Sequence, residues 1–258
     1  MSERPAGRAS ERGPSGPAEG QEREATSRAE AGTMVIVGGG GPPSGGGARE
    51  LAALGAGAAA VIAADSGLEP ALKLGLDVDA VVGDMDSVDP GVLAAATEAG
   101  IPIERHPEAK DATDLALALD VALARHPRRI VVVTGAGDRL DHTLSLAQLL
   151  ASPRTAGVEV EAWIGNAHLI VVRDATVLRG TPGDLVSLVP LNSTALGVVT
   201  DGLLYPLHHE DLPVGSTRGV SNELAAPEAS VRLRSGVLVA VQPGLAGTHW
   251  RRRAAGQP

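Results

Sequence analysis

The chain has 258 residues, a formal net charge of −9 and 43% hydrophobic residues, so it is long enough for one large or two modest domains with a real core. The acidic balance argues against a nucleic-acid partner, because a nucleic-acid-binding surface needs a basic face. The absence of cysteine excludes disulfides, zinc–thiolate sites and thiol catalysis.

The first 32 residues are predicted to be a disordered tail. They contain no Val, Ile, Leu or aromatic residue and mix Arg and Glu with Gly, Pro and Ser, so they cannot bury enough apolar surface to become ordered. No apolar run in the chain is long enough to span a membrane, and nothing at its start resembles a secretory signal. We therefore expect a cytoplasmic protein with no membrane partner.

Residues 33–152 alternate predicted strands with predicted helices. The expected strands are Met34–Val37, Ala59–Ala64, Ala80–Val82, a short one near Ile103, and Ile130–Thr134. The expected helices are Ala48–Leu54, Leu68–Leu74, Pro90–Ala99, Leu115–Arg125 and one that ends at Leu150. This alternation predicts an α/β domain, with a parallel sheet that carries helices on both faces.

Residues 153–247 show a different pattern, in which no helical period survives. Short alternating or β-branched runs are separated by turns, and the predicted strands are Glu159–Ile164, His168–Val172, Leu185–Leu188, Gly197–Thr200, Val231–Leu233 and Val237–Val241. This spacing predicts an all-β domain of the sandwich or barrel type. Residues 248–258 are interpreted as a C-terminal tail.

A pair of carboxylates follows the strand around Val81 and Val82. Gly83 opens the backbone there, and Asp84 and Asp86 come directly after it. Ligands bind at the carboxyl ends of strands in open α/β sheets, and residues two apart in an extended chain point the same way. We therefore expect a cation between the two carboxylates, and oxygen ligands of this kind suit Mg²⁺ with substrate phosphates. The alternative is a polar loop that caps the next helix.

Four more carboxylates follow predicted strand ends or open predicted helices. They are Asp65, Asp111, Asp114 and Asp141. Each has a purely structural explanation as a helix cap, a first-turn acid or an Asx-turn residue. Together they gather on one edge of one sheet, which requires cations. The interleaved Lys110, Arg139 and His142 are suited to phosphate oxygens.

The combination of these motifs resembles thiamine pyrophosphokinase. The segments in the first domain are Ala64–Gly67, Gly83–Ser87, Lys110–Asp114 and Gly137–His142, and those in the second are Ser187–Leu191, Gly202–Leu207 and Gly215–Glu223. Two departures stand out: Asp65-Ser66-Gly67 replaces the commoner Asp-Gly-Gly, and Ser145-Leu146 stand where the family often has Ala-Asn.

The resemblance implies an enzyme, a thiamine diphosphokinase that moves pyrophosphate from ATP to the hydroxyl of thiamine and gives thiamine diphosphate and AMP. It implies Mg²⁺ as cofactor, with ATP and thiamine as the small-molecule partners. It also implies an α/β catalytic domain at residues 33–152, a β-sandwich thiamine-binding domain at 153–247, and a homodimer whose active sites lie between subunits.

The resemblance also assigns roles to individual residues. The implied metal ligands are Asp84, Asp86 and Asp111, and the implied catalytic acidic site adds Asp114 and Asp141. The implied contacts to ATP and its phosphates are Asp65, Ser66, Gly67, Lys110, Arg139 and His142. The implied thiamine contacts are Ser221, Asn222 and Tyr205. For Tyr205 a core position is the preferred interpretation, and stacking on the substrate rings is the alternative.

Three other functions stay open at this point. A haloacid-dehalogenase-type phosphatase also uses Asp-x-Asp after a strand, but Ser87-Val88 match that family poorly and the β domain is then unexplained. A pterin pyrophosphokinase would use similar chemistry, although the second-domain motifs favour thiamine. A non-catalytic thiamine- or nucleotide-binding sensor would be indicated by loss of acidic ligands, and here all are present.

Overall fold

The computed structural model describes residue 1 and residues 32–41, 46–136 and 139–244. Nearly all of the two predicted tails, at 1–32 and 248–258, lies outside the described residues, as do residues 42–45 and Gly137-Asp138. Within the described part, no helix is long and apolar enough to cross a membrane.

Six parallel strands form the centre of the first domain. They are β1 (Thr33–Val37), β2 (Ala60–Ala64), β3 (Ala80–Gly83), β4 (Ile103–Arg105), β5 (Arg129–Thr134) and β6 (Glu159–Ile164). They pair in the order β6-β5-β1-β2-β3-β4, and every pairing is parallel. The last of them, β6, was expected in the all-β domain, but it extends the parallel set because it pairs with β5 along its whole length.

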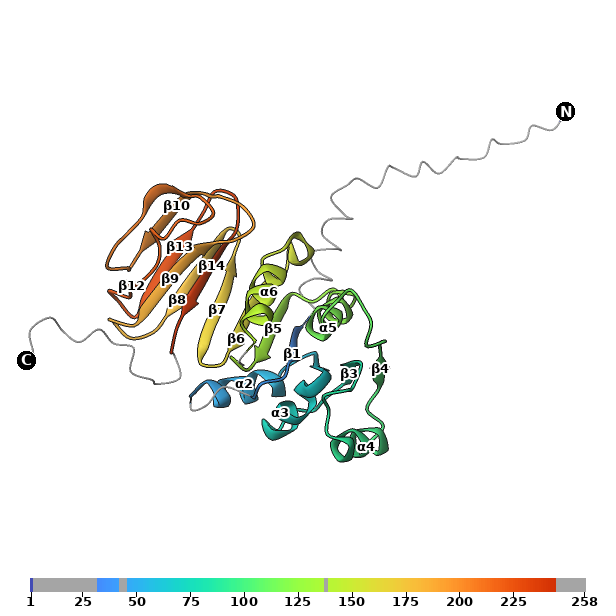
Figure 1. The fold of residues 1–258 in the computed structure, drawn as a ribbon. Coiled ribbons are helices and arrows are strands. Elements are labelled where there is room, and N and C mark those ends of the chain that lie inside the picture. The colour runs from blue at the N-terminus through green and yellow to red at the C-terminus, as the bar shows by residue number, and fades with distance from the viewer. Residues whose placement is uncertain (2–31, 42–45, 137–138, 245–258) are drawn as a thin grey trace, which may run out of the picture.

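Helices cover both faces of this sheet, as the sequence predicts (Figure 1). They are α2 (Gly46–Ala56), α3 (Leu68–Lys73), α4 (Pro90–Glu98), α5 (Asp114–Leu123) and α6 (Leu140–Leu150). Successive strand residues point to opposite faces, so Ile36 packs with Leu119 of α5 and Leu150 of α6, whereas Val37 packs with Leu51 of α2. Two aliphatic cores therefore hold the sheet between its helices.

The same sheet continues into the second domain. Its added strands are β7 (Ala167–Val172), β14 (Leu238–Gln242), β9 (Leu185–Pro190) and β12 (Asn222–Glu223), which pair antiparallel and bring the sheet to ten strands. A four-stranded sheet lies against this half, in the order β11 (His208–Leu212), β10 (Ala195–Asp201), β13 (Glu228–Arg232) and β8 (Ala175–Arg179). Leu188 of β9, Leu238 of β14 and Val231 of β13 share the core between the two sheets. The predicted fold class, an α/β domain followed by a β-sandwich, is confirmed.

An ionic cluster ties the parallel half of the sheet to the antiparallel half. Glu161 on β6 accepts a hydrogen bond from Arg129 on β5 at 2.9 Å and lies 3.0 Å from the His168 ring on β7. His168 also stacks on Trp163, with 4.6 Å between ring centroids. Burial works against the charge of Glu161, but the hydrogen bonds from His168 and Arg129 outweigh it and lower its pKa.

We predict that Glu161→Gln destabilises the protein in a pH-dependent way. Because the pKa of Glu161 is lower in the folded protein than in the unfolded chain, its contribution is present above its ordinary pKa and is lost as the pH falls through the folded value. The variant should lose about 1–2 kcal/mol of unfolding free energy at pH 7, since Arg129 loses a charged partner. Urea unfolding at pH 7 and near pH 4 measures this loss, which should shrink at the lower pH.

Glu159→Gln is the matched control for this prediction. Glu159 lies two residues earlier on the same strand, but its side chain is 61% exposed and 3.5 Å from Arg128. An exposed ion pair contributes little to stability, so this variant should unfold like the parent chain. Equal losses in both variants would contradict the role given to Glu161.

Candidate active site

Three carboxylates meet at the carboxyl edge of the parallel sheet. Asp65 follows β2, Asp84 follows β3, and Asp114 is the first residue of α5, which packs on both strands. The parallel register pairs Ala64 with Val82, so β2 and β3 end side by side. One carboxylate oxygen from each of the three residues lies within 4.8 Å of the other two. The sequence prediction that acidic residues gather on this edge is confirmed for these three.

Gly83 makes this approach possible. A Cβ atom at this position would lie 2.9 Å from Oδ1 of Asp114 and 3.0 Å from Cβ of Asp65, and its φ of 151° is one that side-chain-bearing residues rarely adopt. The end of β3 therefore needs glycine, because two acidic side chains lie against its backbone.

The backbone between Asp84 and Asp86 is not extended, in contrast to what the sequence pattern predicts. Met85 between them has a φ of 67°, so the chain is not extended there, and its side chain is buried in a core with Leu68. Asp86 is exposed, lies outside the group within 4.8 Å, and accepts a hydrogen bond from the Ser87 hydroxyl at 2.8 Å. The backbone turn at Met85 is local strain of the kind found at functional sites, and the Asp84 and Asp86 side chains both line the same cavity.

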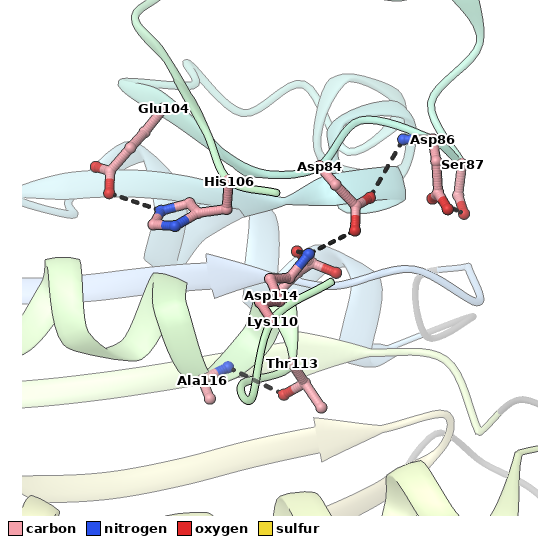
Figure 2. Close-up of polar contacts among 9 residues, drawn as sticks. All are labelled: Asp84, Asp86, Ser87, Glu104, His106, Lys110, Thr113, Asp114 and Ala116. Carbon is pink, nitrogen blue, oxygen red and sulfur yellow. Dashed lines mark hydrogen bonds and ion pairs between the residues drawn. The ribbon is translucent and has the colours of Figure 1, made fainter. Parts of the chain in front are cut away.

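Lys110 contributes the positive charge of the cluster. Its ammonium group donates a hydrogen bond to Asp84 at 2.5 Å and lies 3.0 Å from Oδ1 of Asp114, and Figure 2 shows it reaching towards both while Asp86 and Ser87 lie to one side. The hydrogen bond from Lys110 lowers the pKa of Asp84. Burial works against the charge of Lys110, but its bonds to Asp84 and Asp114 outweigh burial and raise its pKa.

Asp65 is the buried member of the cluster. It is 8% exposed, and its Oδ1 atom has no hydrogen-bond partner among the described residues. Burial, with the charges of Asp114, Asp84 and Asp86 adding to it, raises the pKa of Asp65. Its backbone φ of 45° is also strained. A buried acceptor without a donor, next to two other carboxylates, is suited to a cation.

A cavity of about 420 Å³ opens over this cluster. Seven of the residues predicted for the site line it: Asp65, Ser66, Asp84, Asp86, Asp114, Arg139 and His142. The side chains of Leu115, Leu146, Leu149 and Ile164 give the cavity an apolar part as well. Such a pocket suits a ligand that carries both phosphates and a flat apolar ring.

Four predicted site residues of this domain lie outside the cavity wall. Lys110 contacts the cavity residues Asp84 and Asp114, and Gly67 is buried beneath, where a Cβ atom would lie 1.9 Å from the carbonyl oxygen of Val37. Asp111 is exposed, and the N-cap of α5 is Thr113, whose hydroxyl accepts from the Ala116 N–H at 3.3 Å.

Asp141, the fourth, is exposed and pairs with Arg139 through hydrogen bonds of 3.0 and 2.7 Å. The bond from the Arg139 guanidinium holds the pKa of Asp141 at about 2. The two side chains are 68% and 63% exposed, so the pair lies at the solvent-facing side of the cavity residue Arg139.

The residues that the resemblance assigns to thiamine lie in the other half of the molecule. Asn222 is buried and bonds to the backbone of Tyr205: its Oδ1 accepts from the Tyr205 N–H at 3.0 Å, and its Nδ2 donates to the Tyr205 carbonyl at 2.7 Å. Tyr205 itself is 49% exposed, so the interpretation of Tyr205 as a core residue is wrong. Ser221 is exposed and has a φ of 61°.

The sequence analysis missed several polar residues of the cavity wall. These are Ser87, Thr113, Thr134, Thr143 and Ser145. The position of Thr134 at the end of a strand was a usable signal, because the carboxyl ends of parallel strands meet at one edge. Ser145 belongs to the Ser145-Leu146 departure from the family pattern, and both residues line the cavity.

Comparison with known proteins gives the same family for both halves of the chain. The model of the thiamin pyrophosphokinase catalytic domain matches residues 51–162, and that of the thiamin pyrophosphokinase vitamin B1 binding domain matches residues 168–238. Thiamine pyrophosphokinase of Bacillus subtilis (strain 168) is 26% identical over 183 residues, which are 70% of this chain and 86% of that protein.

Solved structures of similar fold include three with thiamine or thiamin pyrophosphokinase in their names. The protein from Bacillus subtilis has a TM-score of 0.68 at 23% identity, covering 82% of this chain and 98% of its own. That from Geobacillus thermodenitrificans has 0.66 at 24%, covering 85% and 100%. That from Candida albicans has 0.67 at 15%, covering 83% and 90%. At these identities the structures establish the fold alone.

We predict that Asp65→Asn stabilises the metal-free protein. A folded pKa above the unfolded one means that the carboxylate costs stability once the pH rises above its ordinary value of 3.8, and the amide removes that cost. The gain should be about 1 kcal/mol at pH 7 and should vanish below pH 3.8. Urea unfolding in the presence of a chelator measures it. A variant less stable than the parent at pH 7 would show that the carboxylate is satisfied in the folded state.

Proposed function

The chain belongs to the thiamine pyrophosphokinase family, and we propose that it transfers the pyrophosphoryl group of ATP to the hydroxyl oxygen of thiamine, giving thiamine diphosphate and AMP. The observation that carries this proposal is the cluster of Asp65, Asp84 and Asp114 at the edge of the sheet, inside the segment that matches the catalytic domain. The cavity over the cluster combines charged and apolar walls, as a nucleotide requires.

The residues present fit a magnesium ion. The donor set is oxygen only, three carboxylate oxygens lie within 4.8 Å of one another, and the buried Oδ1 of Asp65 lacks a donor among the described residues. Bound there, Mg²⁺ would neutralise the negative charge that develops on the phosphates. We propose Asp65, Asp84 and Asp114 as its protein ligands, with Asp86 added from the cavity wall; Asp111, which the resemblance also implies, would need its loop to move.

The chain's other residues would act mainly by position and charge. Arg139 and His142 lie on the cavity wall where they can bind phosphate oxygens, and the Ser66 hydroxyl, which follows β2, can donate a further hydrogen bond. In-line transfer needs the nucleophile, phosphorus and leaving group held in one geometry, and fixed side chains supply this. No strong base is required, because one cavity carboxylate can accept the hydroxyl proton late in the reaction.

We propose that two copies of the chain build each active site. In the ten-strand order β12 is first and β3 ninth, so eight steps separate Asn222 from the strand before Asp84. At about 4.8 Å a step, this separation is roughly 40 Å along the sheet. One substrate pair cannot bridge that span, so thiamine contacts from Ser221, Asn222 and Tyr205 would reach the acidic cluster of a partner subunit. The exposed Tyr205 and Val220 beside Asn222 fit such an interface.

Product analysis tests the reaction directly. Purified protein with ATP, Mg²⁺ and thiamine should give AMP and thiamine diphosphate in equal amounts, and Asp84→Asn should keep the fold and lower turnover by ~10²-fold or more, since a charged ligand of the metal ion is lost. Formation of ADP and thiamine monophosphate would identify an ordinary kinase instead. Tight thiamine binding without turnover would favour a sensor, and near-normal turnover of a folded Asp84→Asn protein would refute the metal assignment.

Mixing two inactive variants tests the shared site. Asp84→Asn damages the phosphate side, and Asn222→Ala removes the bonds that hold Tyr205. If each site takes one side from each subunit, mixed dimers contain one intact site. A one-to-one mixture should then recover about a quarter of the parent activity after subunit exchange. Sedimentation confirms the dimer, and an inactive mixture of exchanged dimers would place both sides of the site in one subunit.

A further inference from the structure

Lys110 occupies the position that a metal ion would be expected to take. Its ammonium group touches two of the three clustered carboxylates, Asp84 at 2.5 Å and Asp114 at 3.0 Å, and both its side chain and that of Asp84 are only 13% exposed. The third carboxylate, Asp65, is left with an unbonded buried oxygen among the described residues. The site therefore contains three carboxylates and one ammonium group, that of Lys110.

The residue type at this position is unusual for the chain. Only two of its 22 Lys and Arg residues are lysines, Lys73 and Lys110, and all the others are arginines. Lys carries a compact charge on a flexible stem, whereas the planar fork of Arg binds carboxylates in a fixed bidentate geometry. Lysine is therefore better suited than arginine to a position where the cationic group has to leave its carboxylate partners.

We propose that Lys110 is a tethered counter-ion, which holds Asp84 and Asp114 together in the metal-free protein and withdraws from Asp84 when a divalent cation binds. This inference rests on the metal site of the proposed function, but not on the identity of the reaction. Magnesium binds carboxylate oxygens at 2.0–2.1 Å and demands near-octahedral geometry. The ammonium group cannot keep its place on Asp84 beside such an ion, because the two cations repel and compete for the same oxygens.

If the Lys110 ammonium group takes the place of the divalent cation, the three carboxylates can stay close together in the metal-free protein. Without Lys110, Asp84 and Asp114 would repel each other across the mouth of the cavity. With it, the ligands are already assembled when the ion arrives, and the released ammonium group remains beside the cavity, where phosphates would bind. The cost is a weaker affinity for the divalent cation alone.

Amine labelling measures the release, and the second lysine is an internal standard. Lys73 is 69% exposed on α3 and pairs only with Glu69. The parent protein is treated with an amine-acylating reagent, without nucleotide, in the presence and absence of saturating Mn²⁺, and both lysines are quantified by mass spectrometry. We expect Lys110 to react far more slowly than Lys73 without metal. Mn²⁺ should raise the ratio of Lys110 to Lys73 labelling several-fold, because the released amine is no longer held against Asp84, where its side chain is only 13% exposed.

Metal binding by two variants is the second measurement. Mn²⁺ binding followed by electron paramagnetic resonance, again without nucleotide, should tighten roughly tenfold in Lys110→Met, because the competing cation is gone. Lys73→Met is the matched control and should bind like the parent. Lys110→Arg should bind more weakly than the parent, because the guanidinium fork holds the carboxylates more firmly. Circular dichroism checks that each variant is folded.

The outcomes separate this inference from the proposed function. Mn²⁺ binding to the parent with an unchanged labelling ratio, or with no tightening in folded Lys110→Met, overturns the role of Lys110 and leaves the reaction untouched. A parent protein that binds no Mn²⁺ overturns both the metal site and this inference. Neither measurement uses thiamine or turnover, so failure of the product assay alone does not count against the exchange.

Discussion

The parallel hydrogen-bond register of β1, β2, β3 and β5 is the constraint on which the site depends. Pairing in parallel brings the carboxyl ends of neighbouring strands to one edge, so Asp65 and Asp84 become neighbours although 19 positions separate them in the chain. Helix α5 packs on β2 and β3 and begins at the same edge, which adds Asp114. The acidic cluster therefore follows from the topology, together with Gly83, which lets the side chains of Asp65 and Asp114 approach the backbone.

The unfavourable free energy of this cluster is offset by packing elsewhere in the fold. Three carboxylates repel one another, and positive φ values at Asp65 and Met85 add local strain. The compensation is a sheet packed on both faces by small aliphatic side chains, with Val35, Val131 and Leu51 nearly inaccessible to solvent. Because the folding free energy comes from this packing and not from the site, the site can remain electrostatically unfavourable.

Local patterns predicted the elements that carry strong local signals. The β-branched run at Val81 lies within β3, and α4 begins at Pro90 and ends just before Gly100. The polar strand His208–Leu212 and the two-residue strand at Asn222 escaped notice, because only their partners make them strands. The sequence predicted which residues gather at the site, but it did not predict how their side chains are oriented. The left-handed turn at Met85 and the hydrogen bonds of Asn222 to the Tyr205 backbone are set by tertiary packing.

The continuity of the ten-stranded sheet also limits how the protein can move. Strand β6 pairs with β5 along its whole length and with β7 from Glu161 to Ile164, and the Arg129–Glu161–His168 cluster crosses the same junction. A hinge between the two halves would break a row of backbone bonds at once, so closing one half over a ligand by domain rotation is disfavoured. Any closing motion is left to segments outside the strands and to the relative placement of whole subunits.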